Sequence, residues 1–99
     1  MRAVRFSGRA QRQLNEISSY LLKSTGDRRA GARLVLAIEA RMLRLATSSS
    51  TLGRPRPELG AGLRSLPHGA YLIFFTYGDE NIDVLHVLHA RRDLEEYFR

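Results

Sequence analysis

The strongest pattern of apolar positions lies in the last third of the chain, over residues 63–89. A first β-capable segment begins at Leu63 and ends at Pro67, and most of Tyr71–Tyr77 is β-branched or aromatic. A third run of the same kind covers residues 82–89. Short turns between β-prone runs are typical of antiparallel hairpins. We therefore predict three consecutive antiparallel strands.

The first quarter of the chain has a helical pattern after a short β-capable segment, residues 3–6. Ser7 is a typical N-cap and Gly26 a typical C-cap, so we predict a first helix over Gly8–Thr25. Apolar residues recur at helical spacing in Ala10, Leu14, Ile17 and Leu21. The other faces carry Arg9, Arg12, Gln13, Glu16 and Lys23.

A second helical pattern follows directly. Asp27 is suited to cap it by accepting a backbone N–H, and the helix should end near Ala46. Its stripe comprises Ala30, Leu34, Ala37, Ile38, Met42 and Leu45. Two helices joined by so few residues form an antiparallel hairpin. The pair needs a third surface to cover its apolar stripes, and the predicted sheet is the only candidate.

A long connection, residues 47–61, separates the hairpin from the strands. Pro55 and Pro57 exclude a helix or a central strand there. The strand Tyr71–Tyr77 is apolar on both faces, and such strands are normally buried on both. The helices can cover only one face, so the C-terminal segment or a partner must cover the other.

These elements predict one α+β domain over residues 1–99. The order is a strand, a helical hairpin and a three-stranded meander (β-α-α-β-β-β), with the hairpin packed on an antiparallel sheet of about four strands. Residues 90–99 should form a short helix or a fraying tail. Neither a signal peptide nor an apolar run of membrane-spanning length is visible, which predicts a soluble, cytoplasmic protein.

The charge balance narrows the class of partner. The net charge is +6, and the chain has a single lysine, Lys23, so its other basic residues are arginines. Residues 1–64 hold 13 basic and 4 acidic side chains, a net charge of +9, while residues 65–99 hold 3 basic and 6 acidic ones, a net charge of −3. Arginine binds carboxylates and phosphates through a planar fork. A basic surface for an acidic protein partner or a nucleic acid is therefore expected, beside the simpler interpretation of solvated helix faces.

No residue pattern predicts a metal or cofactor site. The chain lacks cysteine, and His86 and His89 are three residues apart on a strand, which places them on opposite faces. Ser65 with His68 or His86 lacks an acid placed to orient the base. We predict no metal and no cofactor.

The arginines at loops and strand ends are the remaining candidates. Each can anchor a carboxylate or phosphate, or simply bind a carbonyl or a nearby acid such as Glu58 or Asp93. Together with one aromatic residue, the predicted partner-binding set is Arg54, Arg56, Arg64, Tyr71, Arg91 and Arg92.

The order of these segments resembles the ParE/RelE superfamily of type II toxin–antitoxin systems. The resemblance rests on Arg5-Phe6-Ser7, on the segment 53–65 with its two prolines, and on the run from Ile82 to Leu94. It implies the fold predicted above and a toxin neutralised by a ParD-like antitoxin that folds on binding, in a hetero-oligomer, as in plasmid stabilisation modules. The ParE branch inhibits DNA gyrase and is not itself an enzyme.

The RelE branch implies a different activity, metal-independent cleavage of mRNA on the ribosome. That branch usually has an arginine after the aromatic residue of the central strand, where this chain has Leu72. The spacing of Arg91 and Tyr97 resembles the nuclease branch, in which Arg64 and Arg91 would clamp a phosphate and Tyr97 would donate a proton. We expect the gyrase-directed branch, with the nuclease and a plain nucleic-acid-binding module as alternatives.

Overall fold

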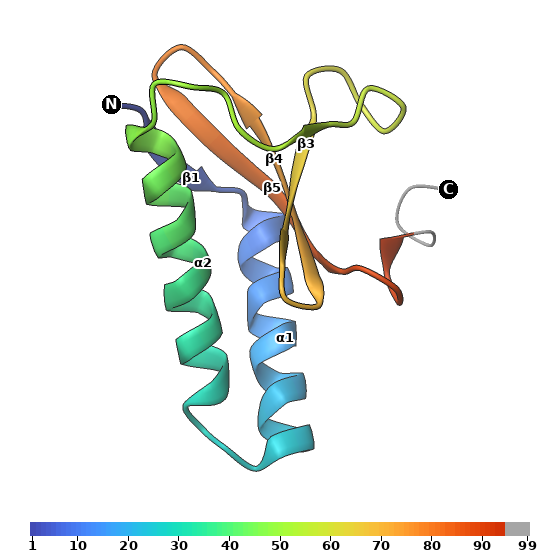
Figure 1. The fold of residues 1–99 in the computed structure, drawn as a ribbon. Coiled ribbons are helices and arrows are strands. Elements are labelled where there is room, and N and C mark those ends of the chain that lie inside the picture. The colour runs from blue at the N-terminus through green and yellow to red at the C-terminus, as the bar shows by residue number, and fades with distance from the viewer. Residues whose placement is uncertain (95–99) are drawn as a thin grey trace.

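The computed structural model describes residues 1–94. The chain forms a helical hairpin packed on one face of a five-stranded sheet (Figure 1). This confirms the predicted α+β class and order of elements. The elements are β1 (Ala3–Phe6), α1 (Gly8–Thr25), α2 (Ala30–Thr47), β2 (Arg54–Pro55), β3 (Arg64–His68), β4 (Tyr71–Tyr77) and β5 (Asn81–His89).

The ends of α1 are set by local chemistry, as predicted. The Ser7 hydroxyl accepts a hydrogen bond from the backbone N–H of Ala10 at 3.0 Å. Gly26 adopts a left-handed conformation, φ 71°, which glycine takes without steric cost, and its N–H donates to the Leu22 carbonyl. These two contacts satisfy backbone groups that a helix end otherwise leaves exposed.

The start of α2 differs from the prediction. The Asp27 carboxylate accepts the Arg29 backbone N–H at 2.8 Å, but the regular helix begins only at Ala30. Asp27 therefore stabilises the turn that leads into α2 and is not the residue adjacent to the helix. The predicted apolar stripe also needs one correction, because Ala37 is exposed.

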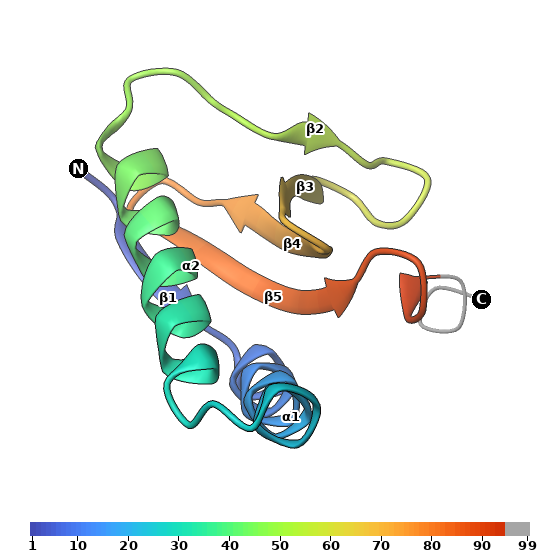
Figure 2. The ribbon, with the colours of Figure 1, turned by 60° about the horizontal axis from the view of Figure 1, so that its bottom comes forward.

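The hairpin projects beyond the sheet at the turn between the two helices (Figure 1). In this distal half the helices pack mainly on each other, and Gly31 is the buried residue of α2 there. A Cβ atom on Gly31 would lie 2.7 Å from the Ser18 Cβ, so the absence of a side chain lets the helices approach closely. The buried side chains of both helices belong to the half nearer the sheet. Figure 2 shows the ribbon of α2 alongside β1 in this half.

The sheet has the order β1-β5-β4-β3-β2, so it has five strands where about four were predicted, and it is mixed because one pair of strands is parallel. β1 joins β5 in a parallel pair, with Val4 opposite Ile82. The proline segment adds a two-residue edge strand, β2, consistent with its exclusion from the sheet centre. A bulge interrupts β4–β5 pairing, because Phe74 lies opposite His86 while Phe75 lies opposite Val84.

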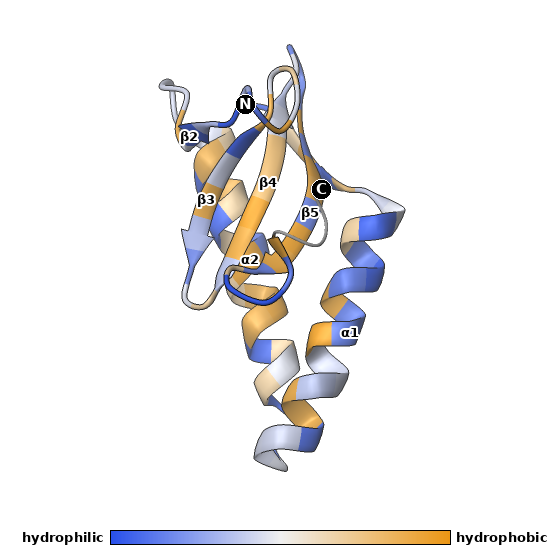
Figure 3. Ribbon diagram, turned by 90° about the vertical axis from the view of Figure 1, so that its right-hand side faces the viewer, coloured by the Kyte–Doolittle hydropathy of each residue, from blue (hydrophilic) through white to orange (hydrophobic). Residues whose placement is uncertain are grey.

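Two apolar clusters occupy the two faces of the sheet. The first lies under the helices and includes Ile73 and Phe75 of β4. The second lies on the opposite face around Phe74 and receives Leu59 from the long connection and Leu94 from the C-terminal segment. β4 is accordingly apolar along its length (Figure 3). The chain itself thus contributes cover to the face for which the sequence predicted a C-terminal segment or a partner.

Candidate partner-binding site

The predicted partner-binding residues separate into two groups. Arg54, Arg56 and Arg64 gather on β2, β3 and the start of the loop after β2. Arg54 is exposed, on the outermost strand. The Arg56 guanidinium donates to the Ser65 hydroxyl at 2.8 Å and lies 3.9 Å from the Glu58 carboxylate. In the first group, therefore, Arg54 is a surface residue, whereas Arg56 is held in place by contacts with its own chain.

Arg64 also has an intramolecular role. Its guanidinium donates to the Gly53 carbonyl at 2.9 Å and lies 5.9 Å from the centre of the Tyr77 ring. Arg2 lies over the same ring at 4.8 Å, and the Tyr77 hydroxyl accepts the Leu52 N–H. Cation–π contacts of this kind hold arginines near an aromatic ring. The result is a preorganised positive edge beside the long connection.

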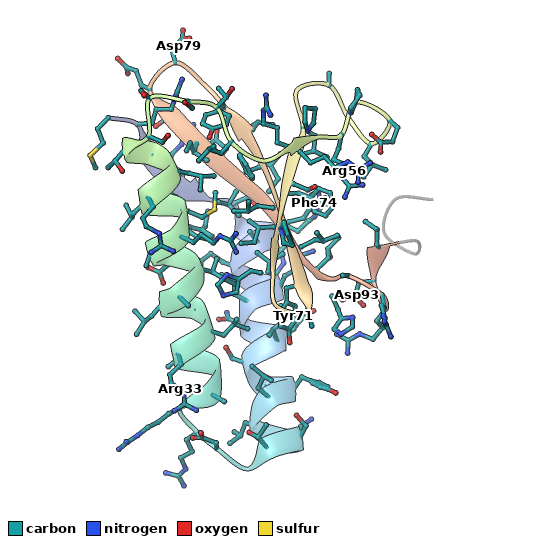
Figure 4. All side chains as sticks on the ribbon, in the orientation of Figure 1. Arg33, Arg56, Tyr71, Phe74, Asp79 and Asp93 are labelled. Carbon is teal, nitrogen blue, oxygen red and sulfur yellow. The ribbon has the colours of Figure 1, made fainter. Side chains whose placement is uncertain are left out.

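Tyr71, Arg91 and Arg92 form the second group: Tyr71 is the first residue of β4, and the two arginines follow the end of β5. Tyr71 packs edge-on against His89 with the ring centres 5.7 Å apart. Arg92 donates to the Asp93 carboxylate and lies 5.2 Å from the centre of the Tyr20 ring. Arg91 is exposed. Figure 4 shows Tyr71 and Asp93 on this side of the molecule, with Arg56 farther along.

Two side chains in or beside the second group, Tyr71 and Asp93, have shifted pKa values. Burial raises the pKa of the Tyr71 hydroxyl, which keeps the phenol neutral. Burial alone would raise the pKa of Asp93, but hydrogen bonds from Arg92 and from the His89 N–H lower it below its ordinary value. Asp93 is thus an ionised partner for Arg92, and Tyr71 presents a neutral hydroxyl for hydrogen bonding.

A cavity of about 400 Å³ lies between α1 and the end of β5. Three arginines, two acids, one amide and three apolar residues surround it: Arg9, Arg12, Gln13, Glu16, Ile17, Val87, Leu88, Arg92 and Asp93. Of these, only Arg92 belonged to the predicted set.

The sequence interpretation placed Gln13 away from the apolar stripe of α1, and the structure contradicts this. Gln13 is only 8% exposed. Its side-chain oxygen accepts the backbone N–H of Val87 at 2.8 Å. A signal for this position was present, because residue 13 follows Ala10 by three positions and precedes Ile17 by four, which is the spacing of one helix face.

The histidines do not gather into a metal site within residues 1–94, and no group of three metal-binding side chains occurs there. His86 contacts Phe74 on one face of the sheet, whereas His89 contacts Tyr71. Within the same described residues, neither helix has the length and hydropathy needed to cross a lipid bilayer. Tyr97, a predicted residue of the alternative nuclease site, lies outside the described residues.

The outer surface of the hairpin carries large apolar side chains. On α2, Leu36 is 65% exposed and Leu43 is 49% exposed. They are seven residues apart, so they lie on the same helix face with the exposed Ala40 between them. We call Leu36, Ala40 and Leu43 the α2 apolar stripe. Arg44 is exposed beside it.

Comparison with known proteins bears on this fold and surface. A chain from a structure described as the chromosomal ParDE TA system from P. aeruginosa shares the fold, with a TM-score of 0.76 and 18% sequence identity. The match covers 90% of this chain and 96% of the other. A search of curated proteins gave no match. The family model for the ParE toxin of the type II toxin–antitoxin system parDE matches residues 4–94, so the chain belongs to the ParE toxin family.

Proposed function

We propose that this toxin inhibits DNA gyrase by protein–protein contact and is neutralised by a ParD-like antitoxin. The observation that carries the proposal is the environment of Leu72, which follows Tyr71 on β4. Leu72 packs against the apolar cluster around Phe74 and Leu88. An RNA-cleaving relative would usually have an arginine at this position. An apolar side chain packed there supplies no phosphate contact, which supports the gyrase-directed branch over an RNA-cleaving one.

The hairpin surface supports the antitoxin part of the proposal. Exposed leucines on the α2 apolar stripe suit an amphipathic segment that folds on binding, with apolar anchors at helical spacing. Residues 1–64 contain the surplus of arginine, which suits a segment rich in carboxylates. We expect a toxin–antitoxin hetero-oligomer that acts in the cytoplasm and serves plasmid stabilisation.

The alternative nuclease site gains less support from the geometry. Arg64 lies opposite Phe75. Arg91 comes two residues after His89, and His89 lies opposite Tyr71. These positions are at opposite ends of β4, separated by about 13 Å of strand at roughly 3.3 Å per residue. A phosphate clamp is more easily built from neighbouring positions. The separation therefore favours an inhibitor over an endoribonuclease.

A side-by-side assay distinguishes the candidate functions. Purified chain is added to gyrase with relaxed plasmid and, separately, to a translation reaction with labelled mRNA. We expect loss of supercoiling with intact mRNA. Ribosome-dependent mRNA cleavage that is lost in Arg91→Ala or Tyr97→Phe would contradict the proposal. Tight DNA binding by the chain alone, with a steep salt dependence, would favour the nucleic-acid-binding module.

A further inference from the structure

Gln13 presents an unsatisfied donor in the wall of the cavity between α1 and β5. Its Oε1 is engaged by the Val87 N–H, which fixes the orientation of the amide. Its Nε2 is buried and has no hydrogen-bond partner. A buried donor without a partner is unfavourable, because it has lost its hydrogen bonds to water. Such a group therefore points to an acceptor that completes the site.

The charged residues of the cavity favour an anion. Arg12 is exposed and forms no ion pair within residues 1–94. Arg92 is already paired with Asp93, so these two charges largely cancel. Counted together, the three arginines and the two acids of the lining give a formal net charge of +1. This balance suits a singly charged carboxylate better than a phosphate dianion.

The remaining wall is apolar. Ile17, Val87 and Leu88 are 6%, 1% and 2% exposed, and they face a cavity large enough for a long side chain. A ligand with a methylene stem and a carboxylate head matches both parts of the lining. One oxygen of that head can accept from Gln13 Nε2, and the other can accept from the Arg12 guanidinium.

From this geometry we infer that the cavity is a binding site for a glutamate or aspartate side chain of an acidic partner segment. The inference deepens the proposed function, because the antitoxin is the source of such a segment. The site itself does not depend on that source. A capped glutamate carries the same carboxylate and stem without any antitoxin sequence, so the site can be tested in the toxin alone.

The test uses the side-chain amide signals of the full-length, ¹⁵N-labelled chain in NMR titrations. Gln11 is exposed and Gln13 is buried, and the chain has no other glutamine. The Gln13 signal therefore reports on the cavity, and the Gln11 signal is its internal control. The probes are N-acetyl-glutamic acid amide, N-acetyl-glutamine amide as the uncharged control, and inorganic phosphate. We expect capped glutamate to move the Gln13 signal saturably while Gln11 stays unchanged. Capped glutamine should have no effect.

Variants separate binding from folding. Gln13→Glu keeps an oxygen for the Val87 N–H but replaces the free donor, so the folded variant should lose capped-glutamate binding. Because this variant has no Gln13 side-chain amide, its binding is followed through the backbone amide signal of Val87. Arg12→Gln should weaken binding about tenfold, the effect of one charge-assisted hydrogen bond. Arg28→Gln is the control, because Arg28 is exposed in the turn between the helices.

Three results would overturn the inference. The first is no movement of the Gln13 signal with capped glutamate. The second is tighter binding of phosphate than of capped glutamate, which would reassign the ligand. The third is wild-type binding by Gln13→Glu. Each of these leaves the toxin function intact, since failure of that function is measured separately by gyrase supercoiling.

Discussion

The Gln13 side-chain oxygen accepts the Val87 backbone N–H at 2.8 Å and joins α1 to β5 through a buried hydrogen bond. Gln13→Ala leaves that N–H without its protein partner, at a residue, Val87, that is only 1% exposed. We expect a loss of about 1–3 kcal/mol in the free energy of unfolding. Urea denaturation measures it.

Gln11→Ala is the matched control for this prediction, because Gln11 lies two residues away on the exposed face of the same helix. A surface substitution of this kind changes stability by less than about 0.5 kcal/mol. Equal effects of the two substitutions would mean that the Gln13–Val87 hydrogen bond contributes nothing measurable.

The two helices approach each other closely at Gly31. An added Cβ there would lie 2.7 Å from the Ser18 Cβ and 2.9 Å from its Cα. Because the second contact is with backbone, the helices must separate. Overpacking costs about 1–3 kcal/mol and the gain in helix propensity returns about 1 kcal/mol, so we expect Gly31→Ala to cost a net ~0–2 kcal/mol. Gly8→Ala is the control, since its nearest contact is the Arg12 guanidinium at 3.5 Å. A stabilised Gly31→Ala variant would contradict the packing.

Stability should depend on pH through His86. Burial lowers the pKa of its imidazole below the ordinary 6.5, and the charge of Arg9 lowers it further. Below pH 6.5 the unfolded chain therefore binds more protons at this residue than the folded chain does. Stability consequently rises with pH across this range and falls on acidification. We expect the melting temperature of the wild type to fall from pH 7 to pH 5 by more than that of His86→Gln. Identical pH profiles would exclude His86 as a source.

The α2 apolar stripe should matter for partner binding and little for folding. Leu36→Lys and Leu43→Lys replace side chains that are 65% and 49% exposed, so stability should change by less than about 0.5 kcal/mol. Affinity for the antitoxin should fall at least tenfold, as calorimetry can measure. Leu52→Lys is the control, at an exposed leucine of the loop after α2. Unchanged affinity in both helix variants would place the antitoxin elsewhere.

Local signals made much of the fold predictable from sequence. The Ser7 cap and Gly26 fixed both ends of α1, because capping depends on neighbouring residues alone. The parallel pairing of β1 with β5 was not predictable in this way. It joins Val4 to Ile82, and nothing local in either segment specifies the orientation. The bulge at Leu85 was not predictable from local sequence either, because it depends on how β4 and β5 pack together.

The candidate site was less accessible to sequence reasoning than the fold. Arginines at strand ends were predicted to bind a partner because of their residue type. In the structure, however, Arg56 donates to Ser65 and Arg64 donates to Gly53 of the same chain. Gln13 was overlooked because a polar residue beside an apolar stripe is normally solvated. Its burial follows from the passage of β5 over α1, which supplies the Val87 N–H. That is a tertiary contact between residues 74 positions apart.

The central claim is that this toxin stops DNA replication through gyrase. The most direct measurement is incorporation of labelled thymidine and labelled methionine in the minutes after the chain is induced in growing cells. We predict that thymidine incorporation falls first and recovers when the cognate antitoxin is co-expressed. A fall in methionine incorporation that precedes any change in thymidine incorporation would contradict the claim and point to the ribosome.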